Sequence, residues 1–225
     1  MKTILPWAAT GLSLLLLALA SSLTEAATLT YDADLVTAGA QDGAGAGWNA
    51  TSVNFWDGVA DVLWPNTTAD VAVFGAGSGA AGSVTVTTVT ANGIIFNAPG
   101  SGNYTLAGST ITLGGTAPTI TANVNATINS TLSAAGGYTK SGAAQLTVGA
   151  NYTGGTVTVA NGTLAFGNSI SGDGFNPSTK QIVINSGGTV LYLGNNKVQN
   201  NVLYTINGGG TLNLNSQGDA LGQVA

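Results

Sequence analysis

The chain has 225 residues, of which 6% are charged, against roughly 25% in an ordinary globular domain. It contains no His and no Cys, and nine Asp or Glu residues against four Lys or Arg residues give a formal net charge of −5. These features exclude a disulfide framework and thiolate metal sites, remove the commonest general base, and argue against nucleic-acid binding, which needs clustered cations.

The segment 1–26 is predicted to be a secretory signal peptide. Lys2 gives a positive start, and Leu12–Leu19 forms a short apolar core. Ala18-Leu19-Ala20 fits the small-x-small cleavage rule, and Thr24-Glu25-Ala26 is a second candidate, with Ala27 as the first mature residue. The alternative is an uncleaved membrane anchor, but the apolar stretch is shorter than the ~20 residues that span a bilayer. We therefore expect export to the extracellular space or the cell surface, with no membrane span in the mature chain.

Residues 27–75 are predicted to form an irregular N-terminal cap. This segment contains the three tryptophans that follow the signal peptide, Trp48, Trp56 and Trp64. It also contains most of the acidic residues of the mature chain, namely Asp32, Asp34, Asp42, Asp57, Asp61 and Asp70. A stack of repeats needs an atypical end unit to cover its first hydrophobic face. Large aromatic side chains suit that role.

From residue 76 to residue 225 the chain is repetitive and nearly uncharged. Runs such as Leu146-Thr147-Val148 alternate apolar and polar residues, which is typical of a β-strand with one buried face. Ile184–Leu193 recurs as Ile206–Asn215, with a period in the low twenties, and Val159–Phe166 is a looser copy. A strand–Gly–strand unit at a fixed offset predicts the coils of a parallel β-helix, or β-solenoid. A sandwich of antiparallel hairpins is the alternative fold. Because the chain stops shortly after a repeat, we expect the solenoid to continue in a longer protein.

The stretch YTKSGAAQLTVGANYTGGTVTVANGTLAFGN, residues 138–168, resembles the autotransporter-associated β-strand repeat. The positions that match the family pattern are Thr139, Lys140, Gly142, Leu146, Gly149, Asn151, Tyr152, Gly154, Gly155, Thr156, Val159, Gly162 and Leu164. The sequence departs at Ala144, where the family usually has Gly, and lacks one residue before Tyr152. The resemblance implies a right-handed parallel β-helix of the passenger type in a secreted bacterial protein. Such regions serve as stalks, adhesins or surface layers, and the family has no shared catalytic residues to carry over.

Two acid pairs are the candidate catalytic or metal-binding groups, Asp32 with Asp34 and Asp57 with Asp61. They suit a calcium site, which takes oxygen ligands, or a glycosidase pair. We favour a third interpretation, in which they are solvated acids of the cap. No acid lies between Asp70 and Asp173, which disfavours an enzyme groove along the solenoid. Lys140, in its Thr-Lys-x-Gly signature, is expected in a solvated turn.

Aromatic and hydroxyl side chains are the candidate contact groups. Trp48, Trp56 and Trp64 are candidates for glycan contact because aromatic faces stack on sugar rings. The alternative, which we favour, is that they cover the end of the solenoid. Outward threonines would form an ice-binding or crystal-binding face only if they stacked in every coil. The irregular spacing of the pairs Thr85/Thr87, Thr110/Thr112 and Thr156/Thr158 argues against such a face.

The sequence therefore predicts an all-β, right-handed parallel β-helix with an irregular N-terminal cap. We expect a secreted or cell-surface, adhesin-like structural protein that acts as a spacer or contact surface, with no catalytic residues, no cofactor and no metal. Its expected partners are surface glycans, other proteins or further copies of itself. The alternative functions are a polysaccharide-acting β-helix enzyme, lyase or hydrolase, and a glycan-binding module.

Overall fold

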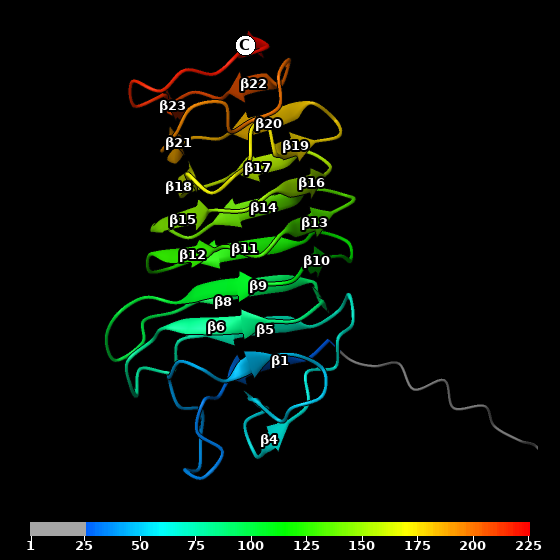
Figure 1. Cartoon of the computed structure of the whole chain (residues 1–225), viewed down its shortest axis with the longest axis vertical. Coiled ribbons are helices and arrows are strands. Elements are labelled where there is room, and N and C mark those ends of the chain that lie inside the picture. Colours follow the sequence, from blue (N-terminus) through cyan, green and yellow to red (C-terminus); the bar gives the residue numbers. More distant parts are fainter. Residues whose placement is uncertain (1–25) are drawn as a thin grey trace, which may run out of the picture.

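The computed structural model describes residues 26–225, so the predicted signal peptide lies outside the described residues apart from Ala26. Residues 26–225 fold into short strands, turns and loops, and this part of the chain contains no helix. No segment of it therefore forms a helix long and apolar enough to cross a membrane. Figure 1 shows a column of stacked coils, with the segment nearest the N-terminus at one end and the C-terminus at the other. The predicted all-β class is confirmed.

Three sheets run along the column. The first sheet has 11 strands: β1 (Thr28–Tyr31), β3 (Phe55–Trp56), β4 (Asp61–Val62), β5 (Val71–Phe74), β8 (Gly93–Phe96), β11 (Thr119–Ala122), β14 (Tyr138–Ser141), β17 (Val157–Val159), β20 (Gln181–Ile184), β22 (Leu203–Ile206) and β24 (Gln223–Val224). The second sheet has 8 strands: β2 (Gly47–Trp48), β6 (Ser83–Val86), β9 (Thr105–Gly108), β12 (Ala126–Ile128), β15 (Gln145–Val148), β18 (Gly162–Phe166), β21 (Gly188–Tyr192) and β23 (Thr211–Asn213). The third sheet has 5 strands: β7 (Val89–Ala91), β10 (Ile111–Leu113), β13 (Leu132–Ala134), β16 (Tyr152–Gly154) and β19 (Phe175–Pro177).

From β5 to β21 the chain visits the first, second and third sheets in turn, so that each circuit is one coil, while β22, β23 and β24 lie in the first and second sheets only. Every strand from β5 to β24 pairs in parallel with the equivalent strand of a neighbouring coil, as in the pairs β5–β8 and β6–β9. Parallel pairing of this kind requires the chain to return to the same edge after each circuit. The molecule is therefore a parallel β-solenoid, and the antiparallel sandwich is excluded.

The repeat offset predicted from the sequence is confirmed for the last coils. Ile184 pairs with Ile206, and Val190 pairs with Leu212. Elsewhere in the first sheet the offset is shorter, as between Tyr138 and Val157, or longer, as between Gly93 and Thr119. Loops at the corners absorb the difference, so strands of unequal sequence spacing still stack in register.

The N-terminal end differs from the coils in its pairing. Strand β1 pairs in parallel with β5 but antiparallel with β3, and β3 pairs antiparallel with β4. This hairpin adds the last two strands to the first sheet at that end (Figure 1). Strands β1 and β2 pair in parallel with β5 and β6, so part of the predicted cap continues the sheets of the coils. The boundary at residue 75 between the cap and the coils stays a prediction.

The core is a continuous apolar column inside the coils. Inward residues of successive coils stack, for example Leu106, Ile128 and Val148, which are fully buried in the second sheet. At the N-terminal end the column closes on packed aromatic rings. The ring centroids of Phe55 and Trp64 lie 4.9 Å apart, and those of Trp48 and Trp64 lie 5.3 Å apart. Aromatic side chains of this size bury enough surface to finish an open solenoid end.

Candidate functional site

The outer face of the first sheet is a long, flat and nearly uncharged surface. Strands alternate inward and outward residues, and the outward residues of β1, β3, β5, β8, β11, β14, β17, β20 and β22 are Thr, Ser, Val, Ile, Leu, Gln, Gly and Trp. Asp61 of β4, opposite Trp56, is the only charged side chain that reaches this face within strands β1 to β22 as described. A ligand lying on the face would therefore meet mainly hydroxyl and apolar groups.

Hydroxyl side chains stack in register on all three sheets. On the first sheet the column is Thr119, Thr139 and Thr158. On the second sheet it is Ser83, Thr105, Thr127 and Thr147. On the third sheet it is Thr90, Thr112, Ser133 and Thr153, followed by Asn176. The irregular sequence spacing was therefore a wrong argument against register, because the corner loops absorb it. The pairs Thr85/Thr87, Thr110/Thr112 and Thr156/Thr158 do not stack on one another, since Thr85, Thr112 and Thr158 lie in three different sheets.

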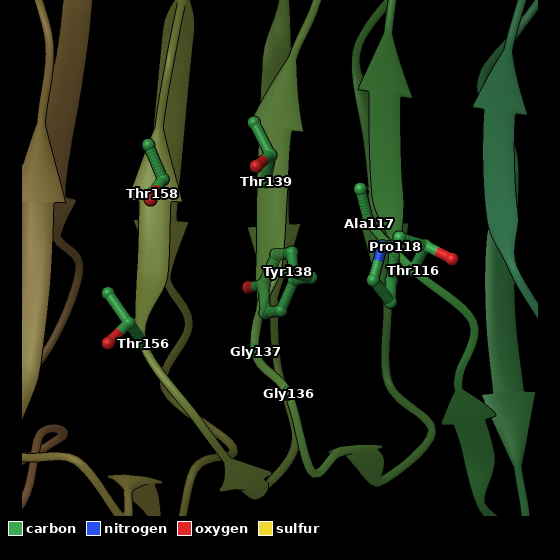
Figure 2. Close-up of a pocket in the computed structure, with 9 residues that line it drawn as sticks. All are labelled: Thr116, Ala117, Pro118, Gly136, Gly137, Tyr138, Thr139, Thr156 and Thr158. Atoms are coloured by element: carbon green, nitrogen blue, oxygen red, sulfur yellow. The ribbon is translucent and has the colours of Figure 1, made fainter.

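A shallow groove of about 180 Å³ crosses the edge of this outer face. It is lined by Thr116, Ala117, Pro118, Gly136, Gly137, Tyr138, Thr139, Thr156 and Thr158. Figure 2 shows these residues on three neighbouring coils, where the loops enter β11, β14 and β17. The two glycines leave the middle coil recessed, because no side chain rises there. The lining contains no carboxylate and no lysine, so the groove offers hydrogen bonds rather than charge.

The three candidate tryptophans fall into two groups. Trp48 and Trp64 are 0% and 1% exposed and belong to the aromatic end of the core. The Trp64 indole Nε1 donates a hydrogen bond to the Thr90 carbonyl at 2.9 Å. Trp56 is half-buried and lies on the outer face of the first sheet, in register with Thr30 of β1. Of the three, Trp56 alone presents surface to a ligand, while the other two cover the solenoid end.

The column that starts at Trp56 continues across the coils as Thr30, Val73, Ile95 and Thr121. The hydroxyl of Thr121 lies 2.8 Å from that of Ser141 on the next coil. The outer face thus changes from apolar groups near Trp56 to hydroxyl groups near the groove. One extended ligand with both apolar and hydroxyl surface would contact both parts.

The acidic residues of the two predicted pairs differ in burial and in their hydrogen bonds. Asp32 is completely buried, so the expectation that it is a solvated acid was wrong. Its Oδ1 accepts hydrogen bonds from the backbone N–H groups of Asp34 and Gln41, while its Oδ2 has no partner. Asp57 is exposed, and the N–H groups of Ala60 and Val59 lower the pKa of its carboxyl.

Asp61 lies beside Asp32. Burial and the neighbouring Asp32 carboxyl raise the pKa of Asp61, since a charged form is disfavoured by desolvation and by a like charge. Asp34 differs, because the Thr37 hydroxyl and nearby backbone N–H groups lower its pKa. Within residues 26–225, no three His, Cys, Asp or Glu side chains gather as a metal site would require. The neighbouring carboxyl groups of Asp32 and Asp61 are therefore not part of a larger cluster of metal-ligating residues in the described part of the chain.

Lys140 lies in the interior, which corrects the expectation of a solvated turn. It is 0% exposed and points inward from β14. Its Nζ donates to the carbonyls of Gly142 at 2.7 Å, Ala144 at 2.6 Å and Asn161 at 2.8 Å. All three protons of the ammonium are thus used. Gly142 has φ +78°, and a Cβ there would clash with the Ala122 carbonyl, so this turn requires glycine.

Lys140 therefore joins two coils. Gly142 and Ala144 belong to the corner between β14 and β15, and Asn161 belongs to the equivalent corner between β17 and β18. The Lys-x-Gly part of the repeat signature corresponds to this contact. Burial lowers the pKa of Lys140 to about 8. Its surroundings are backbone carbonyls, and the lysine has no access to the outer face, so it serves the fold rather than a ligand.

Comparison with known proteins shows that the chain is similar to part of a bacterial adhesin. Over 167 residues the chain is 40% identical to the adhesin BmaC autotransporter of Brucella suis biovar 1 (strain 1330). The match covers 70% of this chain and 5% of the relative, so the chain spans only a small part of that protein's length. No family model matches the chain, and no solved structure matches it. The resemblance seen in the sequence is confirmed: the chain is a parallel β-solenoid homologous to a segment of an autotransporter adhesin.

Proposed function

We propose that this chain is an adhesin-like, non-catalytic solenoid of a secreted or cell-surface protein, and that the outer face of its first sheet is a contact surface. The observation that carries the proposal is the face without charged side chains that runs from Trp56 to Thr205 over successive coils. Similarity to a protein named as an adhesin supports the same function. The stack of coils that carries the face then acts as a spacer that extends from the surface of the cell.

The chemistry of the face favours neutral partners. Flat sheets with regular hydroxyl groups make many weak hydrogen bonds, and each contributes only about 0.5–1.5 kcal/mol. Binding would therefore depend on many coils acting together rather than on one pocket. Surface glycans fit this pattern, with Trp56 as a stacking group and Thr139 and Thr158 as hydrogen-bonding groups. Other proteins and further copies of the chain are the remaining partner classes.

The test is an adhesion assay with charge placed on one face at a time. Beads that carry residues 27–225 are applied to immobilised dextran, to cellulose, to serum glycoproteins and to the chain itself. The double variant Thr139→Asp/Thr158→Asp is compared with the matched control Thr112→Asp/Thr153→Asp on the third sheet. All four positions are outward, so both variants retain the core.

We expect the first-sheet variant to lose adhesion and the third-sheet variant to keep it. Equal loss in both would refute the assignment of the face, and adhesion unchanged in both would refute it as well. A wild-type chain that binds none of the four surfaces would refute a contact role and leave only a spacer role. Trp56→Ala then separates glycan contact from protein contact, since loss confined to the polysaccharides identifies the glycan-binding alternative.

A further inference from the structure

The backbone nitrogen of Ala27 lies against a buried carboxylate. It donates a hydrogen bond to Oδ1 of Asp70 at 3.0 Å. Asp70 is 2% exposed, whereas Ala27 is half-buried and Ala26 is exposed. The two residues immediately precede β1 and β5, which pair in parallel from Thr28 and Val71. Asp70 thus sits at the point where the chain enters the first sheet.

Asp70 has only neutral donors. Its Oδ2 accepts from the hydroxyl of Thr67 at 2.6 Å and from the N–H of Thr67 at 3.3 Å. None of its hydrogen bonds comes from a lysine. A buried carboxylate without a positive partner is costly, so a cation at the position of the Ala27 nitrogen would stabilise the folded chain.

We propose that processing after Ala26 creates this cation. Thr24-Glu25-Ala26 fits the small-x-small cleavage rule, and the peptide bond that it marks is the one that joins Ala26 to Ala27. Hydrolysis of that bond releases the preceding segment with a carboxyl group and leaves Ala27 with a free α-amino group. The Ala27 nitrogen then carries a positive charge at neutral pH. The hydrogen bond from a neutral amide to the Asp70 carboxylate thereby becomes an ion pair.

The competing cleavage site gives a different result. Cleavage after Ala18-Leu19-Ala20 would start the chain at Ser21. The segment 21–26 would then precede Ala27, and the backbone nitrogen of Ala27 would remain a neutral amide. The position of Asp70 therefore favours one site over the other. Further backbone contacts hold the same entry point, because the N–H of Val71 donates to the Ala27 carbonyl at 2.8 Å and the N–H of Asn92 donates to the Asp70 carbonyl at 2.7 Å.

The first measurement is the intact mass of the protein that is exported through its own leader. The expected product begins at Ala27. A product that begins at Ser21, or one that keeps the leader, would overturn the assignment.

The second measurement is a double-mutant cycle of thermal unfolding. It compares chains that begin at Ala27 or at Ser21, each with Asp70 or with the substitution Asp70→Asn. With Asp70 in place, the chain from Ala27 should unfold at least about 2–4 °C above the chain from Ser21, which is a readily measured shift at this size. That difference should largely disappear between the two Asp70→Asn proteins. Because both Asp70→Asn proteins lose the same contact with Thr67, any general damage from the substitution cancels in the comparison. A difference that persists in the Asp70→Asn proteins, or is absent with Asp70, would refute the ion pair.

Discussion

Replacing Lys140 with Met tests the role of the buried lysine. Met keeps most of the length of the side chain but cannot donate a hydrogen bond. The carbonyl of Ala144 would keep a second donor, the N–H of Thr163 at 3.3 Å. The carbonyls of Gly142 and Asn161 would lose the Nζ contact. Each buried carbonyl left without a donor costs about 1–3 kcal/mol, so we expect a loss of about 2–6 kcal/mol.

The assay is equilibrium unfolding in guanidinium chloride, followed by far-UV circular dichroism. Lys180→Met is the matched control, because the Lys180 Nζ donates to the side chain of Gln199 and the lysine is only half-buried. We expect the control to change the free energy of unfolding by about 0.5 kcal/mol or less, as surface substitutions do. If Lys140→Met unfolds at the same denaturant concentration as the control, the three carbonyl contacts do not stabilise the coils.

The same lysine predicts a pH dependence. The folded-state pKa of about 8 lies below the ordinary value of about 10.4. Between these values the unfolded chain binds more protons than the folded chain, so this group makes the protein more stable as the pH rises from 8. Burial raises the pKa of Tyr31 and Tyr152, and such tyrosines reduce stability as the pH rises above about 10. The unfolding midpoint should therefore rise from pH 8 to about 9.5 in the wild type but not in Lys140→Met, and an identical profile in both would contradict the assignment.

The remaining predictions concern structure, register and activity. Far-UV circular dichroism of residues 27–225 should show β-structure, and a helical content near a third, the ordinary globular level, would contradict the fold. Val190→Asp should destabilise more than Leu212→Asp, because Val190 is fully buried whereas Leu212 is half-buried; equal midpoints in urea would contradict this difference in burial. Pectin and alginate should not be cleaved with or without calcium, and turnover that disappears on Asp57→Asn would support the enzyme alternative.

The architecture was predictable because it depends on patterns that the chain repeats. Alternation of apolar and polar residues identified the strands, and the return of Ile184–Leu193 as Ile206–Asn215 identified one coil. The same reasoning paired Val190 with Leu212, as observed. The same offset aligns Tyr192 with Leu214, but Leu214 lies one residue beyond the end of β23, and the pairing stops at Leu191 with Asn213.

The site residues were harder to predict, because their expected exposure came from the general preference of charged residues for solvent and not from the alternation of inward and outward residues along a strand. Lys140 was expected in solvent since lysine is rarely buried. Its alternation with Tyr138, another inward residue, was the available signal for burial. Asp32 was expected in a polar loop for the same reason. Its burial follows from the return of the chain against Asn54, whose carbonyl accepts the N–H of Asp32 at 3.0 Å, and no local pattern records such a contact.

Variable coil length explains how one chain combines a regular face with an irregular sequence. The corner loops differ by several residues, yet the strands remain in register because each inward residue must stack on the one below it to stay out of water. The outward residues take the same register, whatever their spacing in the sequence. Lys140 strengthens it at one corner by holding two successive coils through their backbones. The core therefore keeps the outward side chains aligned, and substitutions among them should change stability by only about 0.5 kcal/mol, which fits the proposed contact surface.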